Sequence, residues 1–192
     1  PAKAANSKSI PLADEFCSAV DQAADDPTVH VVVLQGAGKF FCAGGDVASM
    51  AESADPAEFL GTLAGRMSEG LLALGRSRLV TIAAVQGPAA GAGLALVLNS
   101  DLVLASSNAT FQSAYAAVGL TPDCGVSHLL PLVVGPRRAA EICLAGRVVR
   151  AQEAADWGLV NEVMEESELL PRAEALALQL AGSAVQTLGP PH

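Results

Sequence analysis

The chain of 192 residues has few histidines, few basic residues and no closely spaced cysteine pair, and these shortages exclude several classes of site. Its four cysteines form no CxxC motif and only three histidines are present, so a zinc site is not expected. Lysine and arginine total 11 against 20 aspartates and glutamates, which gives a net charge of −9. A protein that binds nucleic acid needs a surplus of basic side chains to displace counterions, so that class is excluded as well.

Aromatic residues make up only 4% of the chain and charged residues only 16%, whereas 51% of the residues are hydrophobic. This proportion excludes an intrinsically disordered chain and provides enough apolar surface for one well-packed domain. Because alanine and glycine are abundant and aromatics are rare, we expect a core of small side chains that pack closely together.

The sequence indicates neither a secretory leader nor a membrane span. It does not open with a basic and then apolar segment, and cysteines without disulfide spacing are usual in reducing compartments, so we expect a cytoplasmic protein. The segment Leu79–Ser100 lacks charged residues and is long enough to cross a bilayer. However, Gln86-Gly87-Pro88 interrupts it, which favours a buried strand, a loop and a buried helix instead.

Apolar periodicity predicts strands that alternate with helices. The predicted helices are 11–24, 56–75, 94–99, 137–144, 151–157 and 168–181, and another helix follows the loop 119–123. The predicted strands are 30–35, 79–85, 101–105 and 159–163, and within 40–47 a further short strand runs into a glycine-rich loop. Strand, loop and helix recur in that order, which is typical of an α/β fold with its loops gathered at the strand ends.

Two glycine-rich loops follow predicted buried strands, and each leads into a helix. The first contains Cys42-Ala43-Gly44-Gly45-Asp46, with Asp46 placed to cap the next helix, and the second contains Gly91-Ala92-Gly93. Neither the second loop nor Gly36-Ala37-Gly38-Lys39 completes a phosphate-binding motif. The loops could instead direct the N–H groups of Gly45 and Ala92 at one oxygen, as an oxyanion hole requires, or they could be two structural turns.

Segments spread over most of the chain resemble the crotonase, or enoyl-CoA hydratase/isomerase, superfamily. They are 31–47 (VVVLQGAGKFFCAGGDV), 81–94 (TIAAVQGPAAGAGL) with 99–105 (NSDLVLA), 119–125 (GLTPDCG), 129–135 (LLPLVVG) and 151–161 (AQEAADWGLVN). The resemblance implies an α/β fold of the crotonase type, which is a spiral of repeated ββα units with flanking helices. It further implies a single core over residues 1–192 that lacks the first strand and the C-terminal helices of longer family members.

The resemblance also implies an acyl-CoA substrate, with CoA as part of the substrate and with neither a separate cofactor nor a metal. By position, the N–H groups of Gly45 and Ala92 would hold the thioester oxygen and stabilise an enolate. The segment between Met50 and Gly75 would shape the acyl pocket. The residues implied to contact substrate or CoA are Ala43, Gly44, Gly45, Asp46, Val47, Ala92 and Tyr115. The implied assembly is a homotrimer or a dimer of trimers, with neither nucleic acid nor membrane as a partner.

Classical hydratases of the family use two glutamates as acid and base, and the matching positions here hold Ala95 and Tyr115. The alanine side chain has no ionisable group, and tyrosine, with an ordinary pKa of about 10, is a poor base at neutral pH. A classical hydratase is therefore not expected. Asp123, within Thr121-Pro122-Asp123-Cys124-Gly125, resembles the aspartate that shuttles protons in the family's double-bond isomerases. The resemblance therefore favours an enoyl-CoA isomerase with Asp123 as its base.

Alternatives stay open on the sequence alone. Asp123 could merely cap a helix that begins at Cys124. Water addition could use relocated groups, such as Asp123 with Tyr115, or the chain could bind acyl-CoA without catalysis. The neighbours Ser127 and His128 are not expected to form a catalytic triad with Asp123, because adjacent residues on a helix point apart.

Overall fold

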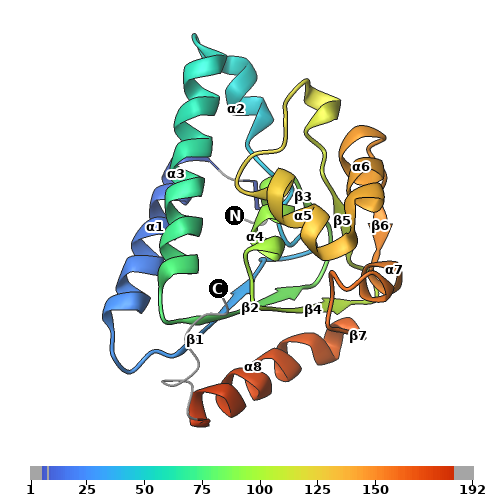
Figure 1. Ribbon diagram of the computed structural model, residues 1–192. Coiled ribbons are helices and arrows are strands. Elements are labelled where there is room, and N and C mark those ends of the chain that lie inside the picture. Colours follow the sequence, from blue (N-terminus) through green and yellow to red (C-terminus); the bar gives the residue numbers. More distant parts are fainter. Residues whose placement is uncertain (1–5, 8, 184–192) are drawn as a thin grey trace.

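The computed structural model describes residues 6–183 apart from residue 8, and two β-sheets form its centre (Figure 1). The larger sheet has the strand order β1-β2-β4-β7, and all its strand pairs are parallel. Its strands are β1 (Val31–Gln35), β2 (Val80–Val85), β4 (Leu102–Ser106) and β7 (Glu162–Met164). The smaller sheet joins β3 (Ala89–Ala90), β5 (Thr110–Gln112) and β6 (Val149–Arg150), in the order β3-β5-β6.

Helices cover both faces of the larger sheet. The long helices α1 (Ile10–Asp25) and α3 (Pro56–Arg76) pack against each other, while α8 (Glu166–Gly182) runs below the sheet in Figure 1 and contacts β1, β2 and β4. The other helices are α2 (Val47–Glu52), α4 (Ala92–Leu98), the short 3-10 helix η2 (Ala116–Val118), α5 (Val126–Val134), α6 (Pro136–Leu144) and α7 (Ala151–Asp156).

The alternation of side chains along β2 separates two parts of the core. Ile82 and Ala84 pack in one cluster with Leu169 of α8, whereas Ala83 and Val85 belong to the main core on the other face. A strand buried on both faces has no solvent-exposed side, which explains why β2 carries no charged residue and is apolar apart from the buried Thr81. Among the residues that the structure describes, no helix combines the length and the apolar character needed to cross a membrane.

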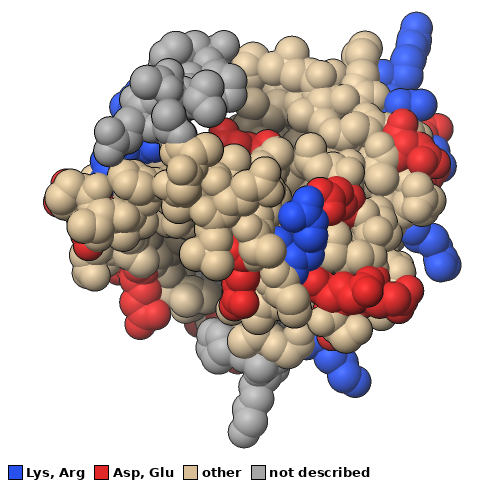
Figure 2. All heavy atoms as spheres, turned by 90° about the horizontal axis from the view of Figure 1, so that it is seen from below, with Lys and Arg blue, Asp and Glu red and all other residues tan. Residues whose placement is uncertain are grey.

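Small side chains let α4 pack closely against its surroundings. Residues 92–97 of this helix are all buried, and three of them are alanine or glycine. Figure 2 shows the face of the molecule that lies below in Figure 1. Acidic side chains are spread over this face, and the basic side chains on it form no continuous surface.

The predicted α/β class is confirmed, as are most of the predicted elements, but several details were wrong. The short strand predicted within 40–47 does not form, because Cys42 and Gly45 take part only in isolated bridges, that of Cys42 being to Ala89, and α2 already begins at Val47. The predicted loop after β2 contains the short strand β3, and α4 begins at Ala92 rather than two residues later. The last strand is also displaced, since β7 starts at Glu162 instead of at residue 159. Residues 1–5 and 184–192, the two ends of the predicted single core, lie outside the described residues.

Candidate active site

The two glycine-rich loops lie directly against each other. The carbonyl of Cys42 accepts a hydrogen bond from Ala90 N at 2.9 Å, which joins the loops through their backbones. A Cβ on Gly44, where φ is +100°, would lie 3.2 Å from the carbonyl oxygen of Ala90, and one on Gly93 would overlap the carbonyl oxygen of Cys42. Only residues without a Cβ permit this approach, so the glycines are required by the contact between the loops.

The second loop also lies next to the side chain of Tyr115. Gly91 has a φ of +53°, and a Cβ there would lie 3.5 Å from Gly44 Cα and 4.0 Å from Tyr115 Cζ. The next residue, Ala92, is the first of α4, and N–H groups in the first turn of a helix have no acceptor within that helix. The junction of the two loops therefore places a helix N-terminus beside the Tyr115 ring.

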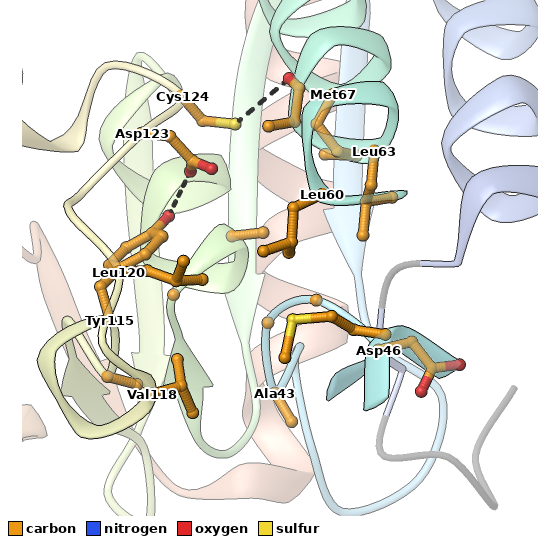
Figure 3. A pocket seen from close by; sticks show the side chains of 17 residues that line it. Ala43, Asp46, Leu60, Leu63, Met67, Tyr115, Val118, Leu120, Asp123 and Cys124 are labelled. Carbon is orange, nitrogen blue, oxygen red and sulfur yellow. Dashed lines mark hydrogen bonds between the residues drawn. The ribbon is translucent and has the colours of Figure 1, made fainter. Parts of the chain in front are cut away.

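A cavity of about 140 Å³ opens at this junction (Figure 3). Residues from both glycine loops, from α2 and α3, and from the segment 114–124 line it. They are Ala43, Gly44, Gly45, Asp46, Met50, Leu60, Leu63, Ala64, Met67, Gly91, Ala92, Ala114, Tyr115, Val118, Leu120, Asp123 and Cys124. Six of the seven residues predicted to contact substrate thus meet at one cavity, together with Asp123. The side chain of the seventh, Val47, lies outside the described part of the structure.

Asp123 and Tyr115 form a hydrogen-bonded pair at the cavity wall. The Tyr115 hydroxyl donates to Asp123 Oδ1 at 2.6 Å, as the dashed line in Figure 3 shows. Tyr115 is only 7% exposed. Burial raises the pKa of the Tyr115 hydroxyl far above its ordinary value, and the bond to the negative Asp123 raises it further. Tyr115 therefore stays a neutral donor that holds the carboxylate in place.

The carboxylate of Asp123 does not cap the following helix. α5 begins at Val126, its N-cap residue is Gly125, and no side chain bonds to the free N–H groups of its first turn. Between Asp123 and this helix, Cys124 and Gly125 have positive φ angles of +49° and +85°, which turn the chain sharply before α5 begins. Asn99 holds this turn, because its Nδ2 donates to the carbonyls of Cys124 at 3.2 Å and Ala95 at 2.8 Å. The capping alternative for Asp123 is therefore wrong.

Asp46, the other carboxylate at the cavity, is a helix cap as predicted. It accepts hydrogen bonds from Ser49 N at 3.1 Å and Ser49 Oγ at 2.7 Å at the start of α2. In Figure 3 its carboxylate is directed away from Tyr115 and Asp123. Among the described lining residues, Asp123 is thus the carboxylate placed to act on a molecule in the cavity.

Other sequence candidates lie away from this chemistry or lack reactivity. Ser127 and His128 are exposed on α5 and do not line the cavity, and Ala95 is completely buried in α4. Cys124 lines the cavity, but burial raises the pKa of its thiol to about 12, helped by the negative charge of Asp123. A thiol that is not ionised at neutral pH is a poor nucleophile.

Sequence reasoning assigned no role to three residues of the cavity wall or to Asn99 beside it. Ala114, Val118 and Leu120 come from a non-repetitive segment around η2, where no periodicity marks which side chains point inward. Asn99 was part of a family motif, yet its bond across to Cys124 depends on contacts that sequence does not reveal.

No group of three or more histidine, cysteine, aspartate or glutamate side chains within residues 6–183, residue 8 aside, is arranged to hold a metal ion.

The single tyrosine of the sequence makes its raised pKa directly measurable. We expect no tyrosinate absorbance from the folded protein at a pH where the unfolded chain, with a pKa of about 10, already titrates. Because the folded state then binds more protons than the unfolded state, its stability falls as the pH rises above about 10 and is fully present below that value. A spectrophotometric pH titration with Tyr115→Phe as blank tests this, and tyrosinate appearing near pH 10 in folded protein would contradict it.

Comparisons with known proteins identify the family of the chain. The family model for enoyl-CoA hydratase/isomerase matches residues 2–188. Among curated proteins, 1,2-epoxyphenylacetyl-CoA isomerase from Escherichia coli K12 is 36% identical over 177 residues, covering 91% of this chain and 68% of the relative. Carnitinyl-CoA dehydratase from Proteus mirabilis is 40% identical over 161 residues, covering 83% of this chain and 60% of the relative. The chain thus spans 60% to 68% of the length of these two relatives.

Solved structures give the same result for the fold. An enoyl-CoA hydratase from Bacillus anthracis superposes with a TM-score of 0.92 at 30% identity, covering 96% of this chain and 71% of that one. A protein described as a putative enoyl-CoA hydratase/isomerase, from Mycobacterium abscessus, gives 0.90 at 35% identity, with coverage of 94% and 70%. The family match, the identities and the shared fold establish that this chain belongs to the enoyl-CoA hydratase/isomerase family of crotonase fold.

Proposed function

We propose that the protein is an enoyl-CoA isomerase that moves a double bond within an acyl-CoA thioester, with Asp123 as its proton shuttle. The observation that carries this proposal is the Asp123 carboxylate at the cavity wall, held by the Tyr115 hydroxyl at 2.6 Å and not used as a helix cap. One carboxylate suffices for isomerisation, because the same group can take a proton from one carbon and return it to another.

The proposed reaction begins with a 3-enoyl-CoA whose thioester oxygen accepts from the N–H groups of Gly45 and Ala92. The Asp123 carboxylate takes a proton from C2, and the electron pair of that C–H bond moves toward the thioester oxygen to form a dienolate. Two fixed N–H donors stabilise the negative charge that develops there. The protonated Asp123 then delivers its proton to C4, which gives the conjugated 2-enoyl-CoA and restores the carboxylate.

Tyr115 has a positioning role in this scheme. Its raised pKa keeps the hydroxyl protonated, so it cannot serve as the second base that activation of a water molecule requires. The hydroxyl instead orients one oxygen of Asp123. Ala95 is buried and carries no acidic group, so the glutamate that a classical hydratase has at this position is without a counterpart here.

A hydratase or dehydratase with unusual acid and base groups is the second candidate. It is favoured by the carnitinyl-CoA dehydratase relative, at 40% identity, and by the close pair of proton-bearing groups, Tyr115 and Asp123. In this scheme the pair would share the work that two glutamates perform elsewhere.

One assay distinguishes the two candidates. The complete natural protein is given a 3-enoyl-CoA and a 2-enoyl-CoA separately, in isotopically labelled water, and the products are analysed by mass spectrometry. The isomerase proposal predicts conversion of the 3-enoyl ester to the conjugated ester without incorporation of oxygen from water. Labelled oxygen at C3 of the product from the 2-enoyl ester would overturn it in favour of the hydratase.

Asn99 provides a test of how the Asp123 turn is positioned. Replacing Asn99 by alanine removes the side-chain bond that joins this turn to the end of α4, and with it the bond to Ala95 that orients the Asn99 amide. We expect kcat to fall roughly tenfold while KM changes little, because the carboxylate loses alignment and the thioester site remains. Steady-state kinetics measure this split, with the exposed Asn108→Ala as the control. A large rise in KM at unchanged kcat would show that Asn99 supports binding instead.

The assembly and location expected from the sequence also remain proposals. We infer a homotrimer or a dimer of trimers in the cytoplasm, with this chain supplying one crotonase core per subunit. Sedimentation analysis of the complete natural protein tests the assembly, and a monomer at working concentration would contradict it.

A further inference from the structure

The cavity has an open end and a closed end. Val118 is 41% exposed at one end, whereas Met67 and Leu63 of α3 are only 1% and 5% exposed. Figure 3 shows Val118 and Ala43 on one side of the cavity and Met67, Leu63 and Cys124 on the opposite side. Met67 and Cys124 therefore form the inner wall of the cavity, whereas Leu63 lies beside the first glycine loop, where a Cβ on Gly45 would be 3.5 Å from Leu63 Cδ2.

Cys124 closes this inner end against α3. Its thiol lies 3.7 Å from the hydroxyl of Ser68 and 4.0 Å from the carbonyl oxygen of Ala64, both within hydrogen-bonding range for sulfur. These contacts join the Asp123 turn to α3 on the side where the cavity would otherwise continue. Met67 is fully buried on the same side of the cavity, so an acyl chain that extends past Asp123 meets the side chains of Met67 and Cys124.

The wall that α2 and α3 contribute has no polar side chain. It consists of Met50, Leu60, Leu63, Ala64 and Met67. Burying a permanent cation against such a wall is costly unless an aromatic cage or an acid pairs with it. The aromatic ring at the cavity is Tyr115, whose hydroxyl already serves Asp123, and a cation paired with Asp123 would occupy the base.

The volume of the cavity limits the size of the acyl group. At about 140 Å³ it is comparable to an engineered apolar cavity, of about 150 Å³, that binds one benzene ring. Roughly six carbon atoms therefore fill it. A longer chain requires either movement of α3 or a shorter side chain at the inner wall.

We propose that the site accepts a short, uncharged acyl group, of roughly six carbon atoms or one ring, and that Met67 sets this limit. The proposal rests on the proposed function, because it assumes that the cavity holds the acyl part of a CoA thioester. It goes beyond that function by naming the class of acyl group and the residue that selects it.

Binding of saturated acyl-CoA esters tests the limit without requiring turnover. Calorimetry on the complete natural protein, with chains from four to twelve carbons, should show affinity rising about fourfold per added methylene up to roughly six carbons and falling for longer chains, which the inner wall excludes. Met67→Ala removes three side-chain atoms and should move that limit outward by on the order of two carbon atoms. Turnover of 3-enoyl esters should shift in the same direction.

Leu71→Ala is the matched control, because Leu71 lies one turn further along α3, is 3% exposed and does not line the cavity. Both variants should lose stability, but only Met67→Ala should change the preferred chain length. Equal affinity of the wild type for chains of six and twelve carbons, a length shift in Leu71→Ala, or turnover of an acyl-CoA with a quaternary ammonium group would each overturn the proposal. If short esters bind with the expected limit but no 3-enoyl ester reacts, the proposed function fails and the acyl class stands.

Discussion

Asp123→Asn is expected to lower the rate of 3-enoyl-CoA isomerisation by roughly 10² to 10⁴-fold, the usual contribution of a general base. Asparagine has nearly the same shape and can still accept the hydrogen bond from Tyr115, so the fold and the affinity for a saturated acyl-CoA should remain close to those of the wild type. The side chain nevertheless cannot take a proton from C2. Steady-state kinetics and calorimetry on the same preparations measure the two properties separately.

Asp156→Asn serves as the control for this variant, because it makes the same substitution at an exposed carboxylate on α7, outside the cavity. It should keep wild-type kinetics. Equal rates for Asp123→Asn and the wild type would remove Asp123 from the reaction. A loss of thioester binding in Asp123→Asn would show instead that the carboxylate shapes the cavity.

Gly93→Ala is expected to have the largest effect on the fold. A Cβ at this position would overlap the carbonyl oxygen of Cys42 and lie 3.0 Å from its Cβ, and it would lie at the hydrogen-bonded junction of the two loops. Neither backbone can move without breaking this junction, so we expect a loss of roughly 3 kcal/mol in stability or complete failure to fold. Any folded fraction should lose activity, because the proposed pairing of the Gly45 and Ala92 N–H groups at one oxygen depends on this junction.

Gly65→Ala in α3 is the matched control, since a Cβ there meets nothing within 4 Å. It should stabilise the protein by up to about 1 kcal/mol through the higher helix propensity of alanine. Thermal unfolding measures both variants. A Gly93→Ala protein with wild-type melting temperature and activity would show that the loops do not need their close approach.

The larger elements of the fold could be predicted because their sequences have a clear period. In β2 every residue from Thr81 to Val85 is buried, and α3 carries Leu63, Met67 and Leu71 at helical spacing. The smaller sheet could not be predicted in this way, since its strands have only two or three residues, too few for a period to be recognised. Its pairing brings Phe111 beside Ala89 and Val149, which lie far apart in the sequence.

The candidate site shows the same division. The glycine loops and Asp123 were found from motifs, and the structure brings them to one cavity. The bond between Tyr115 and Asp123 was not predictable, because a 3-10 helix and Gly119, whose φ is positive, separate the two residues. The limit at Met67 likewise depends on how α3 packs over the loops, which no local pattern encodes.

The central claim is that one carboxylate carries a proton between two carbons of the same substrate, and isotope transfer tests it most directly. A 3-enoyl-CoA carrying deuterium at C2 is converted in ordinary water by the complete natural protein, and the product is analysed early in the reaction. A single-base shuttle predicts that part of the deuterium appears at C4 of the conjugated ester. A product whose C4 hydrogen comes entirely from solvent at the earliest times, or a hydrated product in place of the isomer, would contradict the account.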